Sequence, residues 1–254
     1  MDESPRRKVF AANWKMHKTA AEAREYIEDL CPLVAGSAAE IVVFPGALSV
    51  PAVAEAARGS NICVGLQNIC WAGEGAYTGE ISAAQAAAAG VQYVICGHSE
   101  RRHIFDESGE LVTRKARAAQ SGGLIPLICV GETADERRLE ETEDVLRSDI
   151  FSSLAALEPD GDIIIAYEPV WAIGTGQNAT ADDAEREIAF IRALVAEQWD
   201  ADFAAEIRIL YGGSVNPDNI GEFMAMPNID GVLVGGASLE ARKFAAIVNY
   251  DEQE

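Results

Sequence analysis

The chain has 254 residues, of which 49% are hydrophobic, and a formal net charge of -21 at pH 7. This length fits one α/β barrel or one large doubly wound sheet with a sizeable core. The negative charge repels nucleic acid and anionic membranes, so we expect neither as a partner. An anionic small molecule would need a local site built from backbone N–H groups and a few placed cations.

The cysteine and histidine patterns predict neither a disulfide framework nor a metal centre. The five cysteines contain no Cys-x-x-Cys pair, and the three histidines have no metal-ligand spacing. We therefore expect reduced thiols, no metal and no cofactor. The charged first eight residues are followed by only a short apolar run, which is not typical of a signal peptide, and no run of 18 apolar residues occurs. These features favour a cytoplasmic location.

Short apolar runs, rich in β-branched residues, recur along the chain and predict eight strands. The predicted strands are Lys8–Asn13, Glu40–Phe44, Ile62–Gln67, Gln92–Cys96, Leu124–Val130, Asp162–Glu168, Ile207–Tyr211 and Gly231–Val234. Stretches rich in Ala, Glu and Arg lie between them and predict helices, among them Thr19–Leu30, Ser82–Ala89, Glu107–Gln120, Ala134–Leu157, Ala181–Gln198 and Leu239–Val248. Eight alternations without an obvious linker predict a closed (β/α)8 barrel, with residues 1–254 as one catalytic domain.

Polar candidates follow the first and third strands, at the edge where such barrels hold their active sites. Asn13 ends the first strand and Lys15 follows it, either as a cation of a site or as an ordinary surface lysine. A long loop rich in turn residues, Gly73–Glu80, follows the third strand. Loops of this length often bind something, although a mobile tip is the alternative. The loop lacks the Gly-Lys-Ser/Thr ending of a nucleotide-binding P-loop.

The fourth strand runs into His98, with Ser99 and Glu100 suited to begin a short helix. Because a helix N-terminus disfavours positive charge, His98 could be held neutral and donate a hydrogen bond. The alternative is a structural histidine bonded to a backbone carbonyl. Glu100 and Arg101 form either a plain surface pair or a group that orients Lys15.

The sixth strand ends in a carboxylate, Glu168, and Pro169 then stops the strand because it has no N–H to donate. An apolar segment follows and closes with a Gly-Thr-Gly sequence at residues 174–176. This order is typical of a lid over a carboxylate base. A buried strand with a solvated glutamate at its exit is the alternative.

Paired glycines follow the last two strands, as Gly212-Gly213-Ser214 and as Gly235-Gly236. Glycines let backbone N–H groups approach an anion closely, and barrels often hold phosphate at these two positions. We therefore favour a phosphate site over two ordinary tight turns. The spacing around Gly174 does not match a dinucleotide fingerprint. Cys129 has no histidine nearby in the sequence and is expected to be a buried apolar residue.

Several of these segments together resemble the triosephosphate isomerase family. The resemblance runs in order from Phe10 to about Val248 and is carried by Asn13-Trp14-Lys15-Met16, Gly97-His98-Ser99-Glu100-Arg101-Arg102, the stretch Glu168–Gly176, Tyr211-Gly212-Gly213-Ser214-Val215 and Gly235-Gly236. It implies a (β/α)8 barrel that interconverts dihydroxyacetone phosphate and glyceraldehyde 3-phosphate, a step of glycolysis and gluconeogenesis.

The resemblance also implies roles for individual residues. Glu168 would be the base that moves a proton between neighbouring carbons, and His98 the neutral group that polarises the carbonyl. Lys15 would attract the anionic substrate, with Asn13 in contact beside it and with Glu100 and Ser99 in support. The phosphate would be bound by Asn13, Lys15, Gly174, Ser214, Gly235 and Gly236.

A lid and a homodimer follow from the same resemblance. The lid would consist of Pro169, Val170, Trp171, Ala172, Ile173, Gly174, Thr175 and Gly176, and it would exclude water from the enediolate. The loop Gly73–Glu80 resembles the family's dimer finger, which implies an interface containing Thr78, Tyr77, Gly79 and Met16. The pair Gln177-Asn178 departs from the family pattern at the end of the lid, and such a change would alter the rate at which the lid opens.

Three other functions remain open. A lysine Schiff-base aldolase needs a desolvated lysine at a strand end, but the sixth strand ends in Glu168. An isomerase of a four-carbon ketose phosphate would use the same residues. A catalytically idle binding protein would be expected to lose Glu168 or His98, and both are present.

Overall fold

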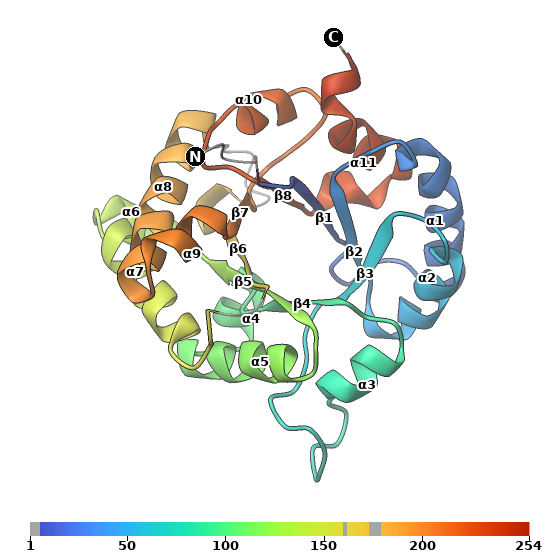
Figure 1. The fold of residues 1–254 in the computed structure, drawn as a ribbon, viewed down its shortest axis with the longest axis horizontal. Helices are drawn as coiled ribbons and strands as arrows, with labels where there is room; N and C mark the ends of the chain where they lie inside the picture. Colours follow the sequence, from blue (N-terminus) through green and yellow to red (C-terminus); the bar gives the residue numbers. More distant parts are fainter. Residues whose placement is uncertain (1–5, 160–161, 173–178, 254) are drawn as a thin grey trace.

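The computed structural model describes residues 6–159, 162–172 and 179–253. Eight parallel strands close into a barrel in chain order, from β1 to β8 (Figure 1). Closure is visible at Val9, which pairs with Glu40 of β2 on one side and with Gly231 of β8 on the other. The strands are β1 Val9–Asn13, β2 Glu40–Phe44, β3 Ile62–Leu66, β4 Tyr93–Cys96, β5 Ile125–Val130, β6 Ile164–Tyr167, β7 Arg208–Tyr211 and β8 Gly231–Val234. The predicted (β/α)8 barrel is confirmed, and each predicted strand is present within two residues at either end.

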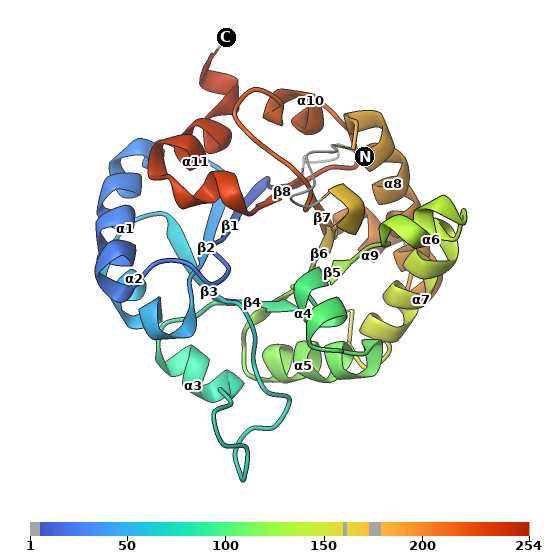
Figure 2. The same ribbon diagram turned by 180° about the vertical axis from the view of Figure 1, so that it is seen from behind.

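Helices form a ring around the barrel, and a long loop between β3 and α3 projects beyond this ring (Figures 1 and 2). The α-helices are α1 Ala20–Val34, α2 Val50–Ala56, α3 Ala83–Ala88, α4 Ser99–Ile104, α5 Gly109–Ser121, α6 Ala134–Arg138, α7 Thr142–Leu154, α8 Ala181–Gln198, α9 Ala201–Glu206, α10 Ile220–Met224 and α11 Ala241–Val248. Short 3-10 helices are η1 Ala47–Ser49, η2 Val170–Ala172, η3 Gly236–Leu239 and η4 Tyr250–Gln253. None of the helices in the described part of the chain combines the length and the apolar character that a membrane crossing requires.

Local sequence signals set where several helices begin. Thr19 and Glu22 form a capping box at α1, and Thr133 and Glu136 form another at α6. The prediction of one helix over Ala134–Leu157 is wrong, because the chain turns between α6 and α7. Glu140 there has a φ of 60°, a left-handed conformation that interrupts a right-handed helix.

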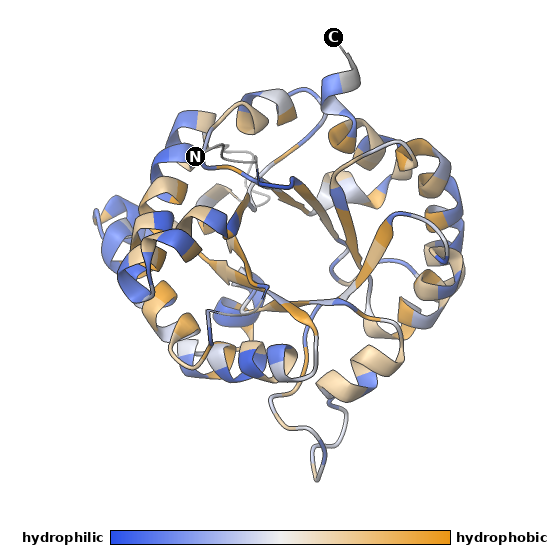
Figure 3. Ribbon diagram, in the orientation of Figure 1, coloured by the Kyte–Doolittle hydropathy of each residue, from blue (hydrophilic) through white to orange (hydrophobic). Residues whose placement is uncertain are grey.

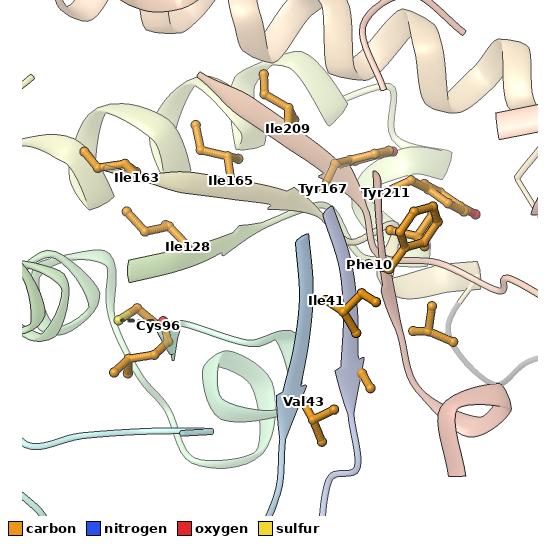
Figure 4. Packing of buried hydrophobic residues seen from close by; sticks show 14 of the residues in the cluster. Phe10, Ile41, Val43, Cys96, Ile128, Ile163, Ile165, Tyr167, Ile209 and Tyr211 are labelled. Carbon is orange, nitrogen blue, oxygen red and sulfur yellow. Dashed lines mark hydrogen bonds between the residues drawn. The ribbon is translucent and has the colours of Figure 1, made fainter. Parts of the chain in front are cut away.

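The core has two shells, because successive side chains of a strand point to opposite faces. One shell fills the barrel interior and includes Ala11, Leu127 and Ala166. The other lies between strands and helices, and Figure 4 shows part of it, with Ile128, Ile165 and Ile209 among the labelled residues. Hydrophobic strands inside a ring of helices with polar outer faces are also visible in Figure 3. Since Glu168 follows Ala166 by two positions, its side chain points into the mouth of the barrel.

Barrel closure leaves no room for a side chain at Gly231. A Cβ atom there would lie 1.9 Å from the carbonyl oxygen of Val9, so the two strands could not pair at this point.

We predict that Gly231→Ala lowers the free energy of unfolding by about 3 kcal/mol or more, measured by urea unfolding. Gly221→Ala is the matched control in α10, where nothing lies within 4 Å of the added carbon. It should be neutral or stabilising by about 0.5 kcal/mol. Equal stabilities of the two variants would contradict this account of closure.

Candidate active site

A cavity of about 240 Å³ opens at the carboxyl ends of the strands. This volume is below the roughly 300–1,000 Å³ of sites for drug-sized ligands, so the cavity suits a small metabolite. Segments that follow β1, β4, β6, β7 and β8 meet here. The lining residues are Asn13, Lys15, His98, Glu168, Gly212, Gly213, Ser214, Val215, Leu233, Gly235, Gly236 and Ala237. Seven of the residues predicted for catalysis or phosphate binding are therefore brought together: Asn13, Lys15, His98, Glu168, Ser214, Gly235 and Gly236.

A buried carboxylate and an imidazole face each other across the cavity. Nε2 of His98 lies 2.9 Å from Oε1 of Glu168, and the side chains are only 6% and 3% exposed. The second carboxylate oxygen, Oε2, accepts a hydrogen bond from the backbone N–H of Ser99 at 2.8 Å. Gly212 leaves room for this carboxylate, since a Cβ there would lie 2.8 Å from Cγ of Glu168. Both oxygens of Glu168 thus have donors although water has little access.

The environment keeps Glu168 ionised. Burial by itself raises the pKa of this carboxyl, but His98, the Ser99 amide and Lys15 together hold the pKa below its usual value. Burial is the largest influence on the pKa of His98 and acts to lower it, but the charge of Glu168, the hydrogen bond to Glu168 and the charge of Glu100 together outweigh it, so that the pKa is raised. A buried carboxylate that remains charged at neutral pH is able to accept a proton.

The hydrogen bonds of His98 define which of its nitrogens carries the proton. Nδ1 accepts the backbone N–H of Glu100 at 3.2 Å, where His98 caps the N-terminus of α4. The raised pKa favours the doubly protonated imidazolium, but an acceptor nitrogen needs a free lone pair. We therefore assign the neutral tautomer in this arrangement, with its proton on Nε2 and directed at Glu168.

Lys15 is the cation among the residues that line the cavity. Its backbone is held in the left-handed region, with a φ of 51°. Two polar side chains hold this conformation, because Oδ1 of Asn13 accepts the N–H of Lys15 at 3.0 Å and Nε2 of Gln67 donates to its carbonyl at 2.8 Å. The Lys15 ammonium pairs with Oε1 of Glu100 at 2.8 Å. Strain of this kind is found where a side chain must be aimed at a ligand.

Of the two alternatives for Glu100 and Arg101, the geometry supports orientation of Lys15 by Glu100. Arg101 does not share this contact, since its Nε donates to Glu107 at 2.5 Å.

The opposite side of the cavity is lined mainly by backbone. Gly235 precedes η3, whose first residue is Gly236, and both residues line the cavity, so the N-terminal end of this short helix lies at its edge. A Cβ on Gly235 would lie 3.5 Å from Cε of Lys15, which brings the lysine and this backbone to the same place. One cation beside the N-terminal backbone of a short helix is a suitable site for a phosphate group.

The segment after Glu168 is anchored to a second buried carboxylate. Oε1 of Glu132 accepts the indole N–H of Trp171 at 2.8 Å, and the Tyr167 hydroxyl donates to Oε2 of Glu132 at 3.1 Å. Pro169 and the 3-10 helix η2, with Val170, Trp171 and Ala172, therefore lie against the end of β5. The rest of the predicted lid, Ile173, Gly174, Thr175 and Gly176, lies outside the described residues, as do Gln177 and Asn178.

Comparison with known proteins identifies the family. The family model described as triosephosphate isomerase matches residues 8–251. The chain belongs to the triosephosphate isomerase family. A triosephosphate isomerase of Moorella thermoacetica is 51% identical over 97% of this chain and 100% of its own length. A triosephosphate isomerase of Caldanaerobacter subterraneus is 49% identical over 96% of this chain and 100% of its own length. The crystal structure of triosephosphate isomerase from Bartonella henselae has a TM-score of 0.90 at 37% identity, over 97% of this chain and 100% of that chain.

Some residues of this family member's site were not found from the sequence. Gln67 holds the Lys15 backbone and also donates to the Phe44 carbonyl at 2.9 Å, although the sequence shows only a glutamine after a strand. Glu132 is completely buried, and its three donors, Tyr167, Trp171 and Arg137, come from separate elements. The only sequence signal for Glu132 was its position after the predicted fifth strand. Neither contact has a sequence spacing that would reveal it.

His98 is expected to control the ionisation of Glu168. In His98→Gln, the Nε2–H hydrogen bond that lowers the pKa of Glu168 is removed while burial, which raises it, remains. We predict that the pKa of Glu168 rises, and carbon-13 NMR of the glutamate Cδ during a pH titration measures it. His103 is exposed, and the control His103→Gln should leave the Glu168 signal as in the parent. An unchanged or lower pKa in His98→Gln would show that other groups keep Glu168 charged.

Proposed function

We propose that this chain interconverts dihydroxyacetone phosphate and D-glyceraldehyde 3-phosphate by proton transfer, as its family name implies, and so acts in glycolysis and gluconeogenesis. The observation that carries the proposal is the buried pair of Glu168 and His98 in the same small cavity as Lys15 and the glycine backbone. A base, a hydrogen-bond donor and an anion site are the three parts that an aldose–ketose isomerase of a phosphorylated sugar requires.

Glu168 is proposed as the base. An ionised carboxylate removes the proton from the carbon beside the carbonyl and returns it to the neighbouring carbon. The carbonyl oxygen becomes negatively charged meanwhile, and the Nε2–H of neutral His98 is placed to stabilise it. The contact of 2.9 Å between His98 and Glu168 means that the substrate would enter at the position where these two groups meet.

Lys15 and Asn13 are proposed to bind the anionic substrate, with Ser214, Gly235 and Gly236 at its phosphate. The protein carries a net charge of -21, so attraction of an anion depends on this local arrangement. Ser99 and Glu100 support it by binding Glu168 and Lys15. Closure of residues 169–176 over the phosphate, with Gly174 in contact, would exclude water from the enediolate.

A coupled assay with glyceraldehyde 3-phosphate tests the proposed reaction. We predict rapid turnover and competitive inhibition by a phosphoglycolate-type compound, because the site is built for a small phosphorylated carbonyl compound. Glu168→Asp should lower kcat by about a hundredfold or more, since shortening the side chain moves the base by roughly 1 Å.

A four-carbon ketose phosphate is the comparison substrate for the same assay, since the named residues would serve it equally. Faster turnover of that compound would keep the roles of Glu168 and His98 and reject the triose as the substrate. Normal triose turnover by Glu168→Asp would instead remove Glu168 from the role of base.

We further propose that the chain forms a homodimer in the cytoplasm and that each chain folds as one catalytic domain. Large exposed apolar side chains lie on the segments that follow β1 to β4, which are neighbours in the barrel. They are Met16, Leu48, Tyr77, Ile104 and Phe105, with Met16 98% exposed. Thr78 and Gly79 extend from the same sector on the projecting loop (Figure 1). Such a cluster of apolar side chains is typical of a surface that another chain covers.

Sedimentation measures the proposed association. At micromolar concentration we expect twice the chain mass of 27.1 kDa. Met16→Asp should shift the protein toward the monomer, because a charge buried in an interface is unfavourable. Leu139→Asp, a similar change at a residue 57% exposed next to α6, should remain dimeric. A monomeric parent protein, or equal dimer stability in the two variants, would contradict this interface.

A further inference from the structure

A polar cluster outside the barrel connects helix α7 to the ends of β4 and β5. Its centre is Arg102 of α4, whose side chain is only 9% exposed. Nε of Arg102 donates to the carbonyl of Gly97 at 2.9 Å, and Nη2 donates to the carbonyl of Cys129 at 3.0 Å. Gly97 directly precedes His98, so one guanidinium fixes the strand end that carries the imidazole relative to β5.

Helix α7 holds this guanidinium from the other side. Oδ1 of Asp149 lies 3.3 Å from Nη1 of Arg102, and Oγ of Ser153 accepts from Nη2 at 2.9 Å. Ser153 is completely buried, and the Asp149 side chain is 18% exposed. Since the planar guanidinium has fixed donor directions, acceptors on two sides define its position.

Asp149 also reaches the strand that adjoins the base. Its Oδ2 accepts the backbone N–H of Gly131 at 3.3 Å, just beyond the end of β5. Gly131 packs against the backbone of Glu168 so closely that a Cβ would lie 1.9 Å from the Glu168 carbonyl oxygen. The carboxylate therefore contacts both the arginine behind His98 and the backbone behind Glu168.

The charge state of Asp149 depends on these partners. Burial raises the pKa of its carboxyl, and the nearby Glu136 of α6 acts in the same direction. Arg102, the Gly131 amide and His103 act to lower it. Burying a charged carboxylate beside an arginine is energetically unfavourable, so this pair would be an inefficient way to fasten α7, for which apolar packing would suffice. Its directional contacts are better suited to holding two backbone segments in register.

We propose that Asp149, with Ser153, acts through Arg102 and Gly131 as a positioning residue that sets the relative placement of His98 and Glu168. This inference rests on the proposed proton transfer between those two groups and a substrate. Asp149 lies outside the catalytic cavity and is not proposed to touch the substrate. Its loss should weaken the proton-transfer step and leave the phosphate site, on β7 and β8, unchanged.

The test compares Asp149→Asn with Asp144→Asn, the same substitution at an exposed aspartate of the same helix. For Asp149→Asn we expect kcat to fall about tenfold, with KM and the inhibition constant of inorganic phosphate within about twofold of the parent. Asp144→Asn should match the parent in all three. A merely structural role would change the thermal midpoint while kcat per folded molecule stayed the same, and that result would overturn the proposal. A parallel loss of phosphate affinity would overturn it too.

Ser153→Ala provides a second variant that keeps the charge pair. We expect a fall in kcat of about two- to threefold with KM unchanged, because one of the acceptors that fix Arg102 is lost. An unchanged kcat would contradict the role of α7 even if Asp149→Asn failed to fold. Turnover by the parent protein separates this inference from the proposed reaction. If the parent does not isomerise the triose phosphate, the proposed function is rejected. If the parent and Asp149→Asn turn over the triose phosphate equally fast, only the positioning role is rejected.

Discussion

The site depends on keeping one carboxylate charged where water has little access. An ionised Glu168 in an apolar barrel mouth would be strongly unfavourable without partners. His98 and the Ser99 amide supply one donor to each oxygen, at 2.9 and 2.8 Å. Both donors come from the segment that leaves β4, so the barrel must hold β4 and β6 in a fixed relation across β5. The ionisation state of Glu168 is therefore a property of the whole fold.

Backbone proximity, more than side-chain chemistry, provides that fixed relation. Gly131 and Gly212 flank Glu168 just beyond the ends of β5 and β7, and a side chain at either would collide with it. Gly97 has a φ of 70° and lies against Val112 and Arg102, which lets the chain turn from β4 into α4 at His98. The absence of Cβ atoms at these three positions allows the side chains of His98 and Glu168, which follow different strands, to reach one another.

The sequence was sufficient for the features that depend on local pattern. Short apolar runs rich in β-branched residues predicted strands such as Glu40–Phe44 with their observed limits, and α8 agrees with its predicted span Ala181–Gln198. The long predicted helix over Ala134–Leu157 failed because the left-handed Glu140 is an ordinary glutamate in the sequence. The site candidates converged because strand order alone places the carboxyl ends of parallel strands at one edge. Gln67, Glu132 and Arg102 were missed since most of their partners are distant in the chain and none obeys a spacing rule.

The arrangement of charges around the cavity follows from the need to keep Glu168 charged where water has little access. A chain with a net charge of -21 must bind an anion at a place where its own carboxylates are engaged. Glu168 is paired with His98, and Glu100 with Lys15, so both carboxylates near the cavity have hydrogen-bond donors close by. Glu100 is partly exposed, so water can solvate it if the proposed phosphate competes for Lys15, whereas the donors of Glu168 are buried. Exposure thus distinguishes Glu100, which is accessible to water, from Glu168, which we propose as the base.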